Sequence, residues 1–115
     1  MAGIDVAKAI PIESVEEFDG WLRAHGATEP ELVIAIFKTS SGQQMVGFAP
    51  LLEAALCHGW VDSRTKSIDD ERYAIRFVPR QAGWNWSERN RATAKRLLAE
   101  GRMTPAGIAA LPPDL

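Results

Sequence analysis

The chain has 115 residues, of which 46% are hydrophobic and 24% charged, and its net charge is −2. This length and balance are typical of one globular domain and leave no room for a second core. The longest strongly apolar run, residues 32–37, is far too short for a membrane span, and the N-terminus lacks the pattern of a secretory signal. A single cysteine, Cys57, excludes an internal disulfide, so we expect a cytoplasmic protein.

The chain opens with residues 1–13, whose weak periodicity predicts a flexible lead or a short edge strand. Ser14 and Glu17 then have the spacing of a capping box, which predicts a helix over about 15–25. Gly26 follows this helix, and we expect it to end the helix in the left-handed conformation.

Residues 31–39 are β-rich and almost continuously apolar, which predicts a strand covered on both faces. After a polar connector, apolar residues recur at helical spacing from Phe48 and predict a second helix that ends at Gly59. Pro50 fits there because the amides of a first helical turn have no partner within the helix.

Residues 60–67 and 72–79 read as two strands joined by an acidic turn, hence a hairpin. Ser87 is a suitable N-cap for a third helix that runs to about residue 100. A short last helix is expected from Thr104 onward.

This order predicts an α+β domain over residues 14–111, followed by a tail over 112–115. Its sheet is expected to be mostly antiparallel and three-stranded, with the hairpin at about 60–79, packed against three or four helices. The sequence shows no repeat and no linker between domains.

Charge is unevenly distributed along the chain. Residues 1–57 carry three Lys/Arg against eight Asp/Glu, a balance of −5, whereas residues 58–115 carry ten against seven, a balance of +3. Within residues 72–102 there are eight basic and two acidic residues, a balance of +6. Such a gradient can steer an anion to one side of the molecule, although a solvated helix face has the same pattern.

The hairpin concentrates cations and rings. In a regular strand four polar or aromatic side chains share one face, namely Trp60, Asp62, Arg64 and Lys66. On the partner strand, Tyr73 alternates with Arg76. One interpretation is an anion-binding face on which Asp62 orients an arginine, and the alternative is that the charges pair with each other across the strands.

The predicted start of the third helix supplies a second candidate. Its free amides, with Ser87, favour an anion, Arg80 is close in sequence, and Trp84 and Trp86 can exclude water. Asn90 falls on the apolar stripe of the helix, so it either faces the site or caps the preceding loop.

Other chemistries find little support. Cys57 and His58 are adjacent on a helix and point about 100° apart, so they do not form a nucleophile–base pair. We expect Cys57 to be a buried small residue and His58 a packed histidine. The sequence has no Cys/His spacing for zinc and no glycine-rich phosphate loop, so we expect no metal and no cofactor.

Several blocks resemble the YdeI/OmpD-associated family, also called bacteriocin-protection proteins. These blocks are Glu53–Asp62, Tyr73 with Arg76–Arg80, Trp86–Ser87 with Asn90, and Glu100–Gly107. The resemblance runs from about Phe18 to Ala110. It implies a small bacterial cytoplasmic protein connected with stress or bacteriocin tolerance. His58 departs from the family pattern, which favours an aromatic residue there, and the C-terminal extension of many members is not present after Leu115.

The sequence therefore predicts a non-catalytic binding domain whose cationic, aromatic-rimmed pocket takes a small anion or an anionic headgroup. The expected ligand-binding residues are Trp60, Asp62, Arg64, Tyr73, Arg76, Arg80, Trp86, Ser87 and Asn90. One alternative is a module that binds single-stranded nucleic acid or another protein. The acidic net charge makes nucleic acid the less favourable of these two partners. Another alternative is a small enzyme that uses Asp62 or Tyr73.

Overall fold

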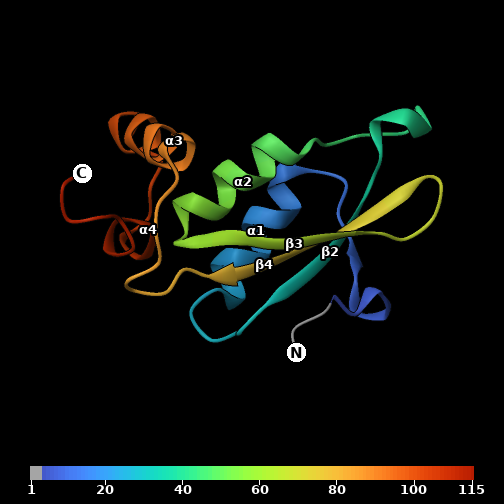
Figure 1. Cartoon of the computed structure of the whole chain (residues 1–115), viewed down its shortest axis with the longest axis horizontal. Helices are drawn as coiled ribbons and strands as arrows, with labels where there is room; N and C mark the ends of the chain where they lie inside the picture. The colour runs from blue at the N-terminus through green and yellow to red at the C-terminus, as the bar shows by residue number, and fades with distance from the viewer. Residues whose placement is uncertain (1–3) are drawn as a thin grey trace.

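The computed structural model of the protein describes residues 4–115 (Figure 1). In chain order its elements are the 3₁₀ helix η1 (Val6–Lys8), strand β1 (Ile10–Pro11), helix α1 (Val15–His25), strand β2 (Leu32–Phe37), the 3₁₀ helix η2 (Thr39–Ser41), helix α2 (Phe48–Cys57), strands β3 (Trp60–Ser67) and β4 (Arg72–Pro79), and helices α3 (Glu88–Ala99) and α4 (Pro105–Ala109). The predicted α+β class and the hairpin are confirmed.

The sheet has four strands in the order β1-β2-β4-β3, not the predicted three. β2 pairs with β4 and β4 with β3 in antiparallel fashion, whereas β1 is parallel to β2 and makes the sheet mixed. The added strand is the two-residue edge β1, which lies within residues 1–13. Two residues are too few to show the alternation by which a strand is recognised in a sequence.

One face of the sheet is covered by α1 and α2, as Figure 1 shows. Their apolar stripes meet the inward side chains of three strands, which buries Leu32, Ile34 and Ile36 of β2. The largest fully buried members of this core are Trp60, Phe18, Phe77, Ile34, Ile36, Leu51 and Ile75. Rings of Phe18 and Phe77 lie 4.8 Å apart between their centroids and join α1 to β4.

A second, smaller apolar cluster holds α3 against the hairpin. Leu97 of α3 packs with Val61 of β3 and Val78 of β4, and Leu56 and Cys57 close the cluster from the end of α2. Figure 1 shows the result, in which α3 and α4 lie together beyond the end of the sheet where β3 begins. The candidate site is built at this end.

Both ends of α1 agree with the predicted 15–25, but the conformation of Gly26, the residue that follows, does not. Ser14 Oγ accepts from the Glu17 N–H at 3.1 Å, whereas the Glu17 carboxylate accepts from the N–H of Glu13, one residue before the one expected. Gly26 has φ −63°, so the expected left-handed cap is wrong. Glycine is required at this position because a Cβ would lie 2.5 Å from the Leu22 carbonyl oxygen. The Gly26 carbonyl also accepts a hydrogen bond from the Trp60 indole N–H at 3.1 Å.

An irregularity in β3 changes which side chains share a face. Asp62 lies opposite Phe77 and Arg64 lies opposite Arg76, so the register shifts at Ser63. The extra residue reverses the alternation. The expected single face that carries Trp60, Asp62, Arg64 and Lys66 is therefore wrong, since the first two residues and the last two face opposite sides of the sheet.

Within the described range 4–115, none of the helices has the length and apolar character needed to cross a bilayer.

Candidate functional site

Two adjoining hollows lie where the end of β4 meets α3 and α4. The central hollow, of about 710 Å³, is lined by His58, the loop over 80–86, α4 and residues 110–113. A second hollow, of about 360 Å³, lies toward the start of α3. Arg80 and Trp84 line both, so they mark the junction. The volume of the central hollow is within the range of small-molecule sites.

The second hollow brings together four of the residues predicted to bind a ligand. These are Asp62, Arg80, Ser87 and Asn90. Ser87 Oγ accepts from the Asn90 N–H at 3.1 Å, which confirms Ser87 as the N-cap of α3. No hydrogen bond to the Asn90 side-chain amide occurs within residues 4–115, so this amide is free to serve a ligand.

Arg80 is the electrostatic centre of the two hollows. Its Nη2 donates to the backbone carbonyls of Asn85 at 2.5 Å and Trp84 at 3.4 Å, and its guanidinium lies 4.0 Å from the centre of the Trp86 ring. Burial lowers the pKa of this guanidinium, which nevertheless remains charged. Of the arginines in the described range that are partly buried, Arg80 alone makes no ion pair with a carboxylate.

The tryptophans divide between core and hollow. Trp84 is 46% exposed, and Trp86 is half-buried beneath Arg80. Both positions suit the predicted aromatic rim. Trp60 borders the central hollow but is only 1% exposed, and its indole packs edge-on against Trp21 with its N–H bound to Gly26. It supports the site from behind and offers a ligand almost no surface.

Three predicted site residues lie elsewhere. Arg76 donates to Glu31 at 2.7 Å and to Ser63 at 3.2 Å, so its charge is already compensated. Arg64 is exposed beside Arg76 on the hairpin and lines neither hollow. Tyr73 packs against the large core, and burial raises the pKa of its hydroxyl. The expected row of converging arginines therefore reduces to Arg80.

Asp62 does not orient an arginine. It lines the second hollow but makes no ion pair within the described residues, because the irregularity at Ser63 turns the next cation, Arg64, to the other face. The two interpretations of Asp62, orienting an arginine or pairing with one across the strands, both assumed that side chains alternate regularly between the two faces of β3.

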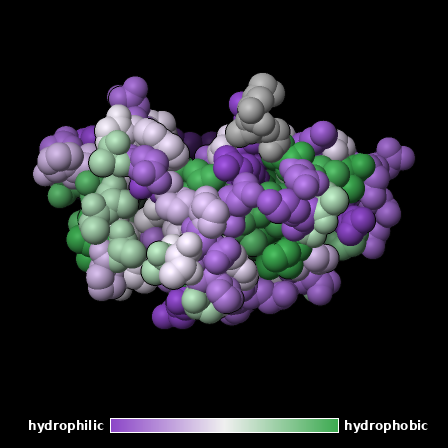
Figure 2. Space-filling view, turned by 90° about the horizontal axis from the view of Figure 1, so that it is seen from below, coloured by the Kyte–Doolittle hydropathy of each residue, from purple (hydrophilic) through white to green (hydrophobic). Residues whose placement is uncertain are grey.

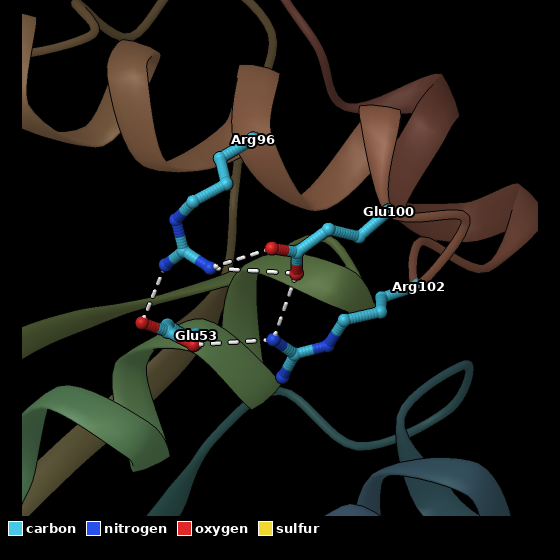
Figure 3. Close-up of polar contacts among 4 residues, drawn as sticks. All are labelled: Glu53, Arg96, Glu100 and Arg102. Carbon is cyan, nitrogen blue, oxygen red and sulfur yellow. Dashed lines mark hydrogen bonds and ion pairs between the residues drawn. The ribbon is translucent and has the colours of Figure 1, made fainter.

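The excess of cations in residues 72–102 is also largely neutralised. Glu53 of α2 and Glu100 each contact both Arg96 of α3 and Arg102, at N–O distances of 2.6 to 3.3 Å, and close a ring of four ion pairs (Figure 3). The spacing of Arg96 and Glu100 by four residues was the one signal for this ring in the sequence. The contribution of Glu53 comes from tertiary structure.

Sequence reasoning missed the environment of His58. Its Nε2 lies 2.7 Å from Asp19 Oδ1, and Asp19 also accepts from Arg23 at 2.9 Å. Desolvation acts to raise the pKa of Asp19, but the hydrogen bonds from His58 and Arg23 outweigh it and hold the pKa below its ordinary value. His58 is therefore packed, as expected, but it also borders the central hollow.

The C-terminal residues form a wall. Leu111, Pro112 and Pro113 line the central hollow, and the Asp114 carboxylate accepts from Arg91 of α3 at 2.6 Å. This bond lowers the pKa of Asp114. The segment predicted as a tail thus contributes to the candidate site.

The described part of the chain contains neither a metal-ligating cluster nor an exposed thiol. No group of three His, Cys, Asp or Glu there is arranged to hold a metal ion. Cys57 is buried, and desolvation raises the pKa of its thiol, which disfavours the reactive thiolate.

Figure 2 shows how hydrophobic and hydrophilic side chains are distributed on one face of the molecule. At the end of the molecule that carries α3 and α4 it is mostly weakly hydrophobic, whereas hydrophilic side chains cover much of the remainder. On this face, the site end is therefore not continuously hydrophilic.

A family model described as a domain of unknown function (DUF8412) matches residues 10–110. No curated protein and no solved structure matches the chain.

Proposed function

Because the chain belongs to the DUF8412 family, a domain of unknown function, its activity must be inferred from its own side chains, and we propose that it is a non-catalytic domain that binds a small anion. The anion contacts Arg80 at the junction of the two hollows. Trp84 and Trp86 form the aromatic part of the rim, and Ser87 and Asn90 supply polar contacts on the side of α3.

The observation that carries this proposal is the uncompensated charge of Arg80. A partly buried guanidinium has lost some of its hydration, and here only backbone carbonyls and the Trp86 ring replace it. A cation–π contact stabilises such a charge by about 0.5–2 kcal/mol. An anion in the hollow adds charge-assisted hydrogen bonds, which are about twice as strong as neutral ones.

Two other function classes receive less support. The enzyme alternative uses Asp62 or Tyr73. Asp62 lines the second hollow, but its carboxylate has no hydrogen-bonded side-chain partner within residues 4–115. Tyr73 lines neither hollow, and its raised pKa makes this hydroxyl a poorer base near neutral pH. A single-stranded nucleic-acid-binding module needs a cationic track, whereas most arginines along the basic stretch are paired with carboxylates.

The cellular role follows only from the resemblance to bacteriocin-protection proteins. We propose stress or bacteriocin tolerance in bacteria, with the anion site as its molecular basis. The resemblance itself remains a prediction.

A thermal-shift screen tests the binding function. Inorganic phosphate, acetate, glycerol phosphate and a short oligothymidylate are each added to the protein at fixed ionic strength. We expect at least one small anion to raise the melting temperature, and Arg80→Ala to abolish the rise.

Arg64→Ala is the matched control, because Arg64 is exposed, makes no ion pair in the described range, and lines neither hollow. It should leave the rise intact. Equal loss of the rise in both variants would show that the effect is diffuse electrostatics. A rise with the oligothymidylate alone would favour the nucleic-acid alternative.

A further inference from the structure

His58 presents an unsatisfied nitrogen. The residue is 9% exposed, and its Nε2 is committed to Asp19 at 2.7 Å. No hydrogen bond reaches Nδ1 within residues 4–115, yet no buried side-chain nitrogen or oxygen there lacks a partner. Nδ1 is therefore not fully buried, and His58 lines the central hollow.

The residues that neighbouring hollows share show where His58 and Arg80 lie along the central hollow. A third hollow, of about 260 Å³, shares Gly26, His58 and Ala106 with the central one. The second hollow shares Arg80 and Trp84 with it. The central hollow thus extends between a His58 end and an Arg80 end.

Between these ends the lining is apolar. Ala106 and Ala109 of α4, with Leu111 and the two prolines after it, face the loop that carries Trp84 and Trp86. No carboxylate of the described residues lines the central hollow. Such a space suits a flat, apolar body and disfavours a strongly hydrated ligand with several charges.

The state of His58 sets the chemistry at its end. The Asp19 carboxylate is an acceptor, so the hydrogen bond places a proton on Nε2, and in that tautomer Nδ1 is the acceptor nitrogen of the ring. A ligand group that meets Nδ1 is then a hydrogen-bond donor, such as a hydroxyl.

We infer that the ligand is an amphipathic monocarboxylic acid, with its carboxylate at Arg80, its flat apolar body in the central hollow, and a donor group at Nδ1 of His58. This inference rests on the proposed anion-binding function and names its ligand class. One guanidinium matches one carboxylate, since the two planar groups form paired hydrogen bonds.

Calorimetric titration with four kinds of probe tests each part. Acetate carries the charge alone, phenylacetate adds the body, 2-phenylethanol keeps the body without the charge, and the three ring-hydroxylated phenylacetates add a donor. We expect phenylacetate to bind at least tenfold more tightly than acetate and than 2-phenylethanol. One hydroxylated isomer should bind several-fold more tightly than phenylacetate, the gain of one hydrogen bond.

His58→Gln isolates the donor contact. A glutamine amide can still donate to Asp19 but has no acceptor at the position of Nδ1, so the gain from the hydroxyl should disappear while phenylacetate binding persists. His25→Gln is the control, because His25 is exposed on α1, lies at a tilt against Trp21 and lines none of the three hollows.

The outcomes separate the two proposals. If acetate or phosphate binds as tightly as phenylacetate, the ligand class is wrong and the anion function stands. If no hydroxylated isomer exceeds phenylacetate in the native protein, the role of His58 is overturned, whether or not its variant folds. If no anion binds at all, both proposals fail.

Discussion

Arg80 illustrates how the same residue type takes different roles through its neighbours. Arg76, four residues earlier in β4, has Glu31 at 2.7 Å, and Arg91 in α3 has Asp114 at 2.6 Å. Arg80 has carbonyls and the Trp86 ring. A compensated guanidinium stabilises the fold, whereas an uncompensated one near a hollow retains attraction for a ligand. The difference between Arg80 and the other two arginines is whether a carboxylate lies within ion-pair distance of the guanidinium.

At the same scale, Asp19 links pH to stability. Its folded-state pKa lies below the ordinary value, so its contribution to stability is complete above the ordinary pKa and is lost as the pH falls through the lower folded value. Asp19→Asn should therefore cost about 1 kcal/mol at pH 7. The difference from the native protein should begin to shrink as the pH falls below the ordinary carboxyl pKa and should vanish once the pH is below the lower folded value. Urea unfolding at a series of pH values measures both.

Glu16→Gln is the control for this prediction, because Glu16 is exposed on the same helix and makes no hydrogen bond in the described range. A cost for Asp19→Asn that stays constant down to acid pH would contradict the role assigned to the charge.

The candidate site could be predicted from sequence only in part, and the failures share a cause. Arg80, Ser87 and Asn90 were found because the helix cap fixes where the last two lie, and Arg80 precedes them by one short loop. Arg64 was misplaced because a one-residue irregularity in β3 has no compositional signal. The partner of Arg76, Glu31, is 45 residues away, and only the folded chain brings them together.

At the scale of elements, α4 shows that a helix can depend on its docking. Five residues are too few for a stable isolated helix. Thr104 caps it by accepting from the Gly107 N–H at 3.2 Å and also donates to the Cys57 carbonyl at 2.8 Å. A Cβ on Gly107 would lie 2.2 Å from the same carbonyl oxygen. The end of α2 and α4 thus touch backbone to backbone.

Gly107→Ala should therefore cost about 2–3 kcal/mol, because the new methyl group forces α4 away from α2. It should also weaken binding of any ligand in the central hollow, of which α4 is one wall. Thermal unfolding and calorimetric titration provide the two readouts.

Gly20→Ala is the opposite case on α1, where a Cβ meets nothing within 4 Å. Removing a helical glycine in open space should stabilise the protein by about 0.5–1 kcal/mol. Equal effects of the two substitutions would refute the docking argument.

Most elements could be predicted because each has a local signal. Helix caps at Ser14, Ser87 and Thr104 and the acidic turn of the hairpin rely on contacts over a few residues. β1 lacks such a signal, since its two residues are defined by parallel pairing to a strand 24 residues later, with Ile10 opposite Ile34. Non-local pairing is the information that a single sequence does not show.

At the scale of the whole molecule, the acidic first half and the basic second half of the chain neutralise each other. Glu31 binds Arg76, and Glu53 of α2 binds the arginines of the later ion-pair ring. Part of the charge gradient along the sequence is therefore taken up by ion pairs that join the two halves. Among the partly buried arginines of the described range, it leaves Arg80 without a carboxylate partner.

The ring in Figure 3 should contribute modestly to stability, because its members are 27–46% exposed. Glu53→Gln should cost about 0.5–1 kcal/mol in low salt and less in molar salt. A double-mutant cycle with Arg96→Gln, followed by urea unfolding at both salt concentrations, measures the coupling. A coupling that is large and independent of salt would contradict a solvent-screened ring.

The division of the tryptophans between core and rim equips the chain with its own optical reporter. Trp84, exposed beside the hollow, emits from a wet environment, whereas Trp60, sealed behind it, emits from a dry one. A ligand that expels water from the hollow should shift fluorescence toward the blue through Trp84 and Trp86 alone. Replacing Trp84 with phenylalanine should remove most of this signal, which makes occupancy readable without any label.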